Sequence, residues 1–124
     1  MSYSIEYNKK KKCIYVAVEG VLELALFERM ASEIAKIIKD RDCGKIINDL
    51  RNAVPPESSA DIYFMPERAL NAGVSRAIKR ALVVSGSVED YKFLRTVFVN
   101  QGNVVRLFDS IDDAEQWLLK KADS

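Results

Sequence analysis

The chain has 124 residues, the length of one domain, and a domain of this size buries about two-thirds of the surface that its unfolded form exposes. Nineteen basic and 18 acidic side chains leave a formal net charge of +1, so we expect no broad positive surface for nucleic acid phosphates. Histidine is absent, which excludes imidazole acid/base catalysis, Ser-His-Asp triads and His-ligated zinc.

Cysteine content and hydropathy limit the class of protein further. Cys13 and Cys43 are too far apart for a CxxC pair and too few for a disulfide scaffold or a metal cluster, so we expect two buried, reduced thiols and neither a metal nor a cofactor. No stretch approaches the ~20 apolar residues of a membrane span, and the first 12 residues lack the apolar core of a signal peptide. We expect one cytoplasmic domain over residues 1–124.

The first third of the chain predicts a β-hairpin followed by a helix. Residues 2–8 and 13–18 alternate between apolar and polar side chains, which is typical of strands, and four lysines at positions 9–12 connect them. These lysines fit a solvated turn that discourages edge pairing, or alternatively contact with an anionic membrane at its inner face. After Gly20, apolar residues recur at three- and four-residue steps and predict an amphipathic helix over about residues 22–40.

Residues 45–61 contain the first candidate site. The β-branched pair Ile46 and Ile47 predicts a short interior strand that ends near Leu50, in a polar cluster formed by Asp49, Arg51 and Asn52. A double proline at 55–56 then interrupts regular structure, and Ser58 or Ser59 is suited to cap the next helix. Ligands of open α/β sheets commonly bind beyond the carboxyl ends of the strands, where we expect this loop to lie.

The next segment, residues 59–73, is unusually apolar and contains Pro66 near its middle. Because proline lacks an N–H and crowds the carbonyl four residues earlier, we expect a kinked helix or two short helices. The four successive apolar residues Ile62–Met65 cannot all point to one face of a helix, so at least one of Tyr63 and Phe64 should be exposed or cover a pocket. The segment is either part of the core or a loosely held lid over an apolar cavity.

The second half of the chain predicts two more strand–helix units. A β-rich run over residues 77–84 is apolar at residues 82–84 and has the cations Arg76, Lys79 and Arg80 at its entrance. These cations could neutralise a lipid head group or a phosphate. Ser87 is suited to cap a helix that Gly102 ends, residues 103–108 predict a strand, and a capped helix begins near Ile111. We therefore predict an α/β fold with a mixed, mostly parallel sheet that opens with a β-hairpin and is flanked by about four helices.

This arrangement resembles the STAS fold of anti-sigma-factor antagonists of the SpoIIAA type. In those proteins the strand that corresponds to the one predicted here near residues 46–50 ends in Asp-Leu or Asn-Leu. An Asp-Ser-Ser-Gly motif with the regulatory phosphoserine then opens the next helix. Asp49-Leu50 matches the first motif, and residues 57–60, Glu-Ser-Ser-Ala, stand in the place of the second.

The chain also resembles the SpoIIAA-like branch of small bacterial proteins, described as STAS/SEC14-like. The similar segments are Asp49-Leu50-Arg51, Tyr63-Phe64-Met65-Pro66, Val105-Arg106-Leu107-Phe108 and Glu115-Gln116-Trp117-Leu118. This resemblance implies a mobile second helix over an apolar cavity, association with lipid or membrane, and no established catalysis.

Two functional hypotheses follow, and we do not expect an enzyme. The first is a binding module that holds an apolar or amphipathic small molecule beneath residues 62–70, with a polar head fixed at the rim. Its ligand-contacting residues would be Asp49, Arg51, Ser58, Ile62, Tyr63, Phe64, Met65 and Leu70. The alternative is a partner-switching protein controlled by phosphorylation at Ser58 or Ser59, which otherwise act as simple helix caps. The apolar residues at 62–65 could also be buried in a homodimer or against another protein partner.

Overall fold

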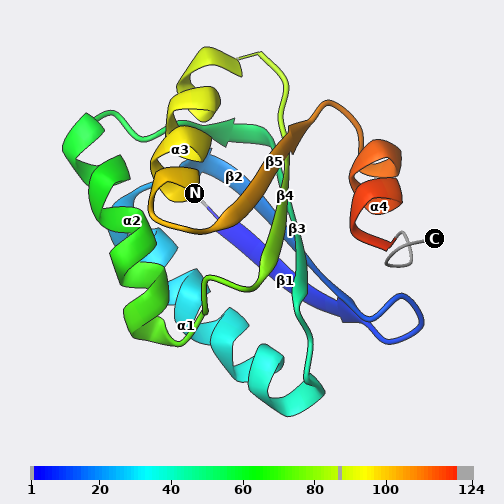
Figure 1. Ribbon diagram of the computed structural model, residues 1–124. Helices are drawn as coiled ribbons and strands as arrows, with labels where there is room; N and C mark the ends of the chain where they lie inside the picture. Colours follow the sequence, from blue (N-terminus) through cyan, green and yellow to red (C-terminus); the bar gives the residue numbers. More distant parts are fainter. Residues whose placement is uncertain (1, 87, 120–124) are drawn as a thin grey trace.

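The computed structural model describes residues 2–86 and 88–119, which form an α/β domain (Figure 1). Its elements, in chain order, are β1 (Ser2–Asn8), β2 (Cys13–Val21), α1 (Leu24–Arg41), β3 (Lys45–Val54), α2 (Ser59–Ala72), β4 (Lys79–Val83), α3 (Val88–Asn100), β5 (Val104–Phe108) and α4 (Ile111–Leu119). The strands make one sheet in the order β1-β2-β3-β4-β5, with β1 antiparallel to β2 and the other neighbours parallel. The predicted fold class is confirmed.

The helices cover the two faces of the sheet unequally, with α1, α2 and α3 on one face and α4 on the other (Figure 1). Successive strand residues point to opposite faces, so each buried strand contributes to two apolar clusters. In β3, Ile46 and Leu50 belong to the large cluster beneath α1–α3, whereas Ile47 belongs to the small cluster beneath α4. The larger core therefore lies on the three-helix side.

The strand β3 is longer than its sequence predicts, because β2 supports its second half. The sequence favours an end near Leu50, but β3 continues to Val54, and its last residues pair with β2 in the register Gly20↔Ala53 and Val21↔Val54. On the other side β4 stops at Val83, which pairs with Asp49. The polar residues Asp49 and Arg51 consequently lie within the strand and not in a loop after it.

The apolar segment after the double proline is one helix, α2, with Pro66 inside it, so of the two expected arrangements, one kinked helix or two short helices, the second is wrong. The Ser58 Oγ accepts a hydrogen bond from the Asp61 backbone N–H at 3.4 Å, which confirms a serine N-cap. Pro66 lies inside the helix, and residues on both sides of it, Met65 and Ala69 among them, are buried in the core. The helix ends at Gly73, whose φ of 108° suits glycine.

Other sequence expectations concern the cysteines, the caps and membrane spans. Cys13 and Cys43 are both buried and free. The Ser110 Oγ accepts a hydrogen bond from the Asp113 backbone N–H at 3.1 Å at the start of α4, whereas the predicted cap at Ser87 lies outside the described residues. Among the helices described here, none has the length and apolar character needed to cross a membrane.

Candidate ligand-binding site

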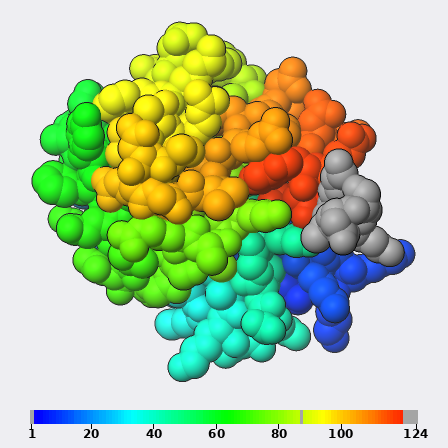
Figure 2. All heavy atoms as spheres, in the orientation of Figure 1, coloured from blue at the N-terminus to red at the C-terminus, as the bar shows by residue number. Residues whose placement is uncertain are grey.

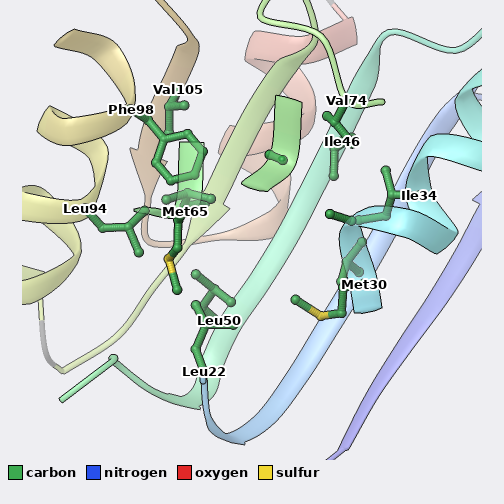
Figure 3. Packing of buried hydrophobic residues seen from close by; sticks show 14 of the residues in the cluster. Leu22, Met30, Ile34, Ile46, Leu50, Met65, Val74, Leu94, Phe98 and Val105 are labelled. Carbon is green, nitrogen blue, oxygen red and sulfur yellow. The ribbon is translucent and has the colours of Figure 1, made fainter. Parts of the chain in front are cut away.

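A cavity of about 60 Å³ lies between the sheet and the helices α1, α2 and α3. Fourteen of its 16 lining residues are apolar, and the remaining two are Asn48 and Arg80. Figure 3 shows ten of the apolar ones, with Met65 of α2 and Leu94 of α3 directed toward Leu50 of β3. The cavity thus lies in the larger core and is bounded on one side by α2, the helix of the apolar segment at residues 59–73.

The helical repeat divides the apolar residues of α2 between the core and the surface. Ile62, Met65 and Ala69 recur at three- and four-residue steps and are buried in the large cluster, and the latter two line the cavity. Tyr63 and Phe64 fall between them and are 57% and 48% exposed. The expectation that at least one of these two aromatic residues is exposed is confirmed for both.

The exposed aromatic residues of α2 do not line the cavity. Tyr63 packs edge to face on Phe93 of α3, with ring centroids 5.8 Å apart. Phe64 lies beneath the guanidinium of Arg68, 5.8 Å from its ring centroid. Leu70 is also exposed on this helix. These three residues of the expected ligand set therefore form part of the outer surface of α2, separate from Ile62 and Met65 in the core.

Asp49 and Arg51 lie on the opposite face of the sheet from the cavity, which corrects the expectation that they fix a polar head at its rim. They follow Ile47 at two-residue steps, and alternation along the strand places all three on the α4 side. Arg51 donates to the two Asp49 carboxylate oxygens from Nε and Nη2, both at 2.9 Å. These bonds lower the pKa of Asp49. The β3 side chain that does line the cavity is the preceding residue, Asn48.

A buried arginine, Arg80, is the charged residue that sequence reasoning did not place inside the protein. It stands in β4 opposite Ile46 and Val105, which puts it on the three-helix face. Its Nη1 donates to Asn103 Oδ1 at 3.1 Å and to the Ile78 carbonyl at 3.5 Å, and its guanidinium lies 5.5 Å from the Phe98 ring centroid. Burial lowers the pKa of Arg80 to about 10, so it stays protonated at neutral pH. The cavity therefore has one cationic side chain.

Ser58 and Ser59 lie near a second, polar groove at the carboxyl ends of β2 and β3. This groove has a volume of about 510 Å³ and is lined by Val21, Glu23, Leu24, Ala25, Pro56, Glu57, Ser58 and Asp61. Ser58 is half-buried and Ser59 is exposed. The predicted position of this loop beyond the strand ends is confirmed, but the groove is separate from the apolar cavity because the two share no lining residue.

Comparison with known proteins identifies the fold. No protein-family model matches the chain, and no curated protein sequence matches it. Its structure is similar to the crystal structure of an uncharacterized protein from the DUF3478 family with a SpoIIAA-like fold, from Shewanella loihica PV-4. The TM-score is 0.62 at 15% sequence identity, and the match covers 94% of this chain and 92% of that chain. The protein has a SpoIIAA-like α/β fold, as the sequence resemblance implied.

Proposed function

We propose that this protein is a non-enzymatic binding module that holds an apolar or amphipathic small molecule between its sheet and the helices α1–α3. The observation that supports the proposal is the apolar cavity in the larger core, because ligand sites combine apolar walls with a few polar groups. Asn48 and Arg80 are the polar groups here. The SpoIIAA-like fold by itself selects no ligand.

The size of the cavity indicates that α2 must move when a larger molecule binds. A volume of about 60 Å³ exceeds the roughly 10–15 Å³ that one water needs, but ordinary ligand pockets span about 300–1,000 Å³. Among the helices of this face, α2 contains the interior proline, and it packs against its neighbours α1 and α3. Outward displacement of α2 would enlarge the space beneath Met65 and Ala69.

Binding of the neutral dye N-phenyl-1-naphthylamine, whose fluorescence rises in apolar sites, tests this proposal. It is measured in the wild type and in a variant in which a larger side chain of α2 fills the cavity. The Ala69→Leu variant adds apolar atoms where Ala69 lines the cavity and should weaken dye binding at least tenfold. The matched control Ala60→Leu makes the same change at an exposed position of α2 and should leave binding within twofold. Equal losses in both variants, or no dye binding to the wild type, would contradict the proposal. Ala31→Leu repeats the filling from α1 if the first variant does not fold.

A second candidate function is partner switching controlled by phosphorylation, and it is favoured by the two serines at the start of α2 in a SpoIIAA-like fold. Ser58 already caps the helix, and the carboxylates of Glu57 and Asp61 near it would repel a phosphate. The exposed Ser59 is the better acceptor of the two. Incubation with an anti-sigma-type kinase, followed by intact-mass analysis, tests whether the protein is phosphorylated and at which serine. Ser59→Ala should abolish the added phosphoryl group, and Ser58→Ala should retain it.

The outer surface of α2 supports one further part of the proposal, contact with another molecule. Tyr63, Phe64 and Leu70 are exposed there, and Figure 2 shows α2 beside α3 on one side of the molecule. Exposed apolar side chains often mark association. The partners proposed for this surface are a second copy of the chain, another protein, or a membrane in peripheral contact. Sedimentation velocity and vesicle co-sedimentation of the Phe64→Ser variant would separate self-association from membrane contact.

A further inference from the structure

The one cation of the cavity wall has no carboxylate partner among the described residues. Arg80 is only 7% exposed, and no ion pair of the described chain includes it. The nitrogen Nη1 has two acceptors, but the buried Nη2 has no hydrogen-bond partner within residues 2–86 and 88–119. Two N–H donors of a charged group are therefore buried without an acceptor.

Such a group is unusual in a protein interior, where buried polar atoms are almost always hydrogen-bonded and buried charges are almost always paired. Burial is the sole cause that shifts the pKa of Arg80, because no neighbouring charge contributes. The pKa remains far above neutrality, so loss of the proton does not relieve the unpaired charge. An anion that enters the cavity would supply the missing acceptor.

The surroundings of Arg80 hold its guanidinium in a fixed orientation. The Asn103 Nδ2 donates to the Phe98 carbonyl at 3.0 Å, which turns the Asn103 Oδ1 toward Arg80 Nη1. The ring of Phe98 lies against the guanidinium and also lines the cavity. Because guanidinium is planar and rigid, fixing Nη1 also fixes the direction in which Nη2 presents its two N–H groups.

We infer that the ligand of this cavity is an amphipathic anion, a short hydrocarbon body that ends in a carboxylate or phosphate oxyanion held by Arg80 Nη2. The apolar wall, with Leu50, Met65 and Leu94, contacts the hydrocarbon part. The oxyanion accepts hydrogen bonds from the nitrogen that has none, which is the pairing that guanidinium geometry favours. This inference rests on the proposed function of the cavity and names the class of molecule that it binds.

Calorimetric titration with octanoate and 1-octanol tests the inference, because the two probes share one chain length and differ in charge. The wild type should bind octanoate roughly tenfold to a hundredfold more tightly than 1-octanol, the range for a hydrogen bond to a charged group. In Arg80→Met, which keeps a long unbranched side chain, this preference should disappear while 1-octanol affinity stays within about threefold. The control Lys79→Met removes a neighbouring exposed cation and should keep the full preference. Arg80→Gln serves the same purpose if the methionine variant does not fold.

The outcomes separate this inference from the function on which it rests. Equal affinity of the wild type for octanoate and 1-octanol, unchanged by Arg80→Met, would overturn the anionic head and leave the apolar binding site intact. Failure of both probes to bind the wild type would overturn the binding function itself. Octyl phosphate in a parallel titration identifies the head, since a preference for it over octanoate that Arg80→Met abolishes supports a phosphate.

Discussion

At the scale of single residues, a shift of one position along a strand decides which face of the sheet a side chain occupies. Asp49 and Arg51 lie on the α4 side, whereas Asn48 faces the cavity. Their ion pair is partly exposed, with 42% of the Arg51 side chain and 24% of the Asp49 side chain accessible, so it contributes at most about 1 kcal/mol. These two residues therefore belong to the stability of β3 and not to the proposed ligand site.

The Arg51→Ala variant should separate these roles. We expect dye binding within twofold of wild type and a loss of stability of at most about 1 kcal/mol at neutral pH. Because the hydrogen bonds from Arg51 lower the pKa of Asp49 in the folded protein, their stabilisation is present above the unfolded pKa of about 3.9 and is lost as pH falls through the lower folded value. Urea unfolding of both proteins at several pH values should show the two converging in acid. A variant that loses dye binding while it remains folded would return Arg51 to the site.

Arg80 shows what residue-level sequence reading missed and what signal was present. The sequence presents it with Arg76 and Lys79 as one of three cations at the entrance to a strand. However, that strand is apolar at Leu82, Val83 and Val84, which indicates burial on both faces. Arg80 stands directly beside this apolar run, whereas Lys79 at the start of the strand is exposed. The pattern could have identified Arg80 as internal, but its missing acceptor depends on Asn103 and Phe98, which are distant in sequence.

At the scale of elements, α2 combines a stable start and end with a weakened centre. The Ser58 cap and Gly73 define its ends, but Pro66 cannot donate to the Ile62 carbonyl. The ion pair from Arg68 Nη1 to Glu28 Oε2, 2.5 Å long, joins α2 to α1 at its outer side. Because Pro66 leaves α2 with one backbone hydrogen bond fewer, we expect this helix to be displaced more easily than α1 or α3.

Replacement of Pro66 by alanine tests this weakness. An interior proline costs about 3 kcal/mol, while the loss of its buried ring atoms and of its restraint on the unfolded chain costs about 2 kcal/mol, so Pro66→Ala should stabilise the protein by about 1 kcal/mol. Amide hydrogen exchange of residues 62–70 should slow, and dye association should slow with it, because the wall opens less often. Exchange of α3 serves as the internal control. Unchanged exchange in α2 would show that Pro66 does not set its mobility.

The elements themselves were largely predictable from sequence because their signals are local. Period-two runs gave β1 and the start of β2, and three- and four-residue spacing gave α1. The second half of β3 was missed, since it exists only through pairing with residues 20 and 21 of β2. For α2 the sequence left two arrangements open, one kinked helix or two short helices, because proline tends to break helices locally. The chain forms one helix, and tertiary burial around Pro66 outweighs that local tendency.

At the scale of the whole molecule, the unequal helix layers determine where a guest can be held. Three helices cover one face and form the larger core, in which the cavity lies, while α4 packs on β3, β4 and β5 from the other side (Figure 1). A molecule bound beneath α2, as we propose, would therefore contact side chains from the sheet and from α2 and α3 together. Binding at the outer surface of α2 would involve Tyr63 and Phe64 instead.

The central claim is that a ligand binds in the cavity beneath α2. Intermolecular nuclear Overhauser effects between 1-octanol and the protein test it most directly, since they report which side chains the bound molecule touches. We predict effects from the alkyl chain to Met65, Leu50 and Leu94, which lie around the cavity in Figure 3. The Ala69→Leu variant should lose them. Effects confined to the exposed rings of Tyr63 and Phe64, with none to the three internal methyl-bearing side chains, would contradict an internal binding site.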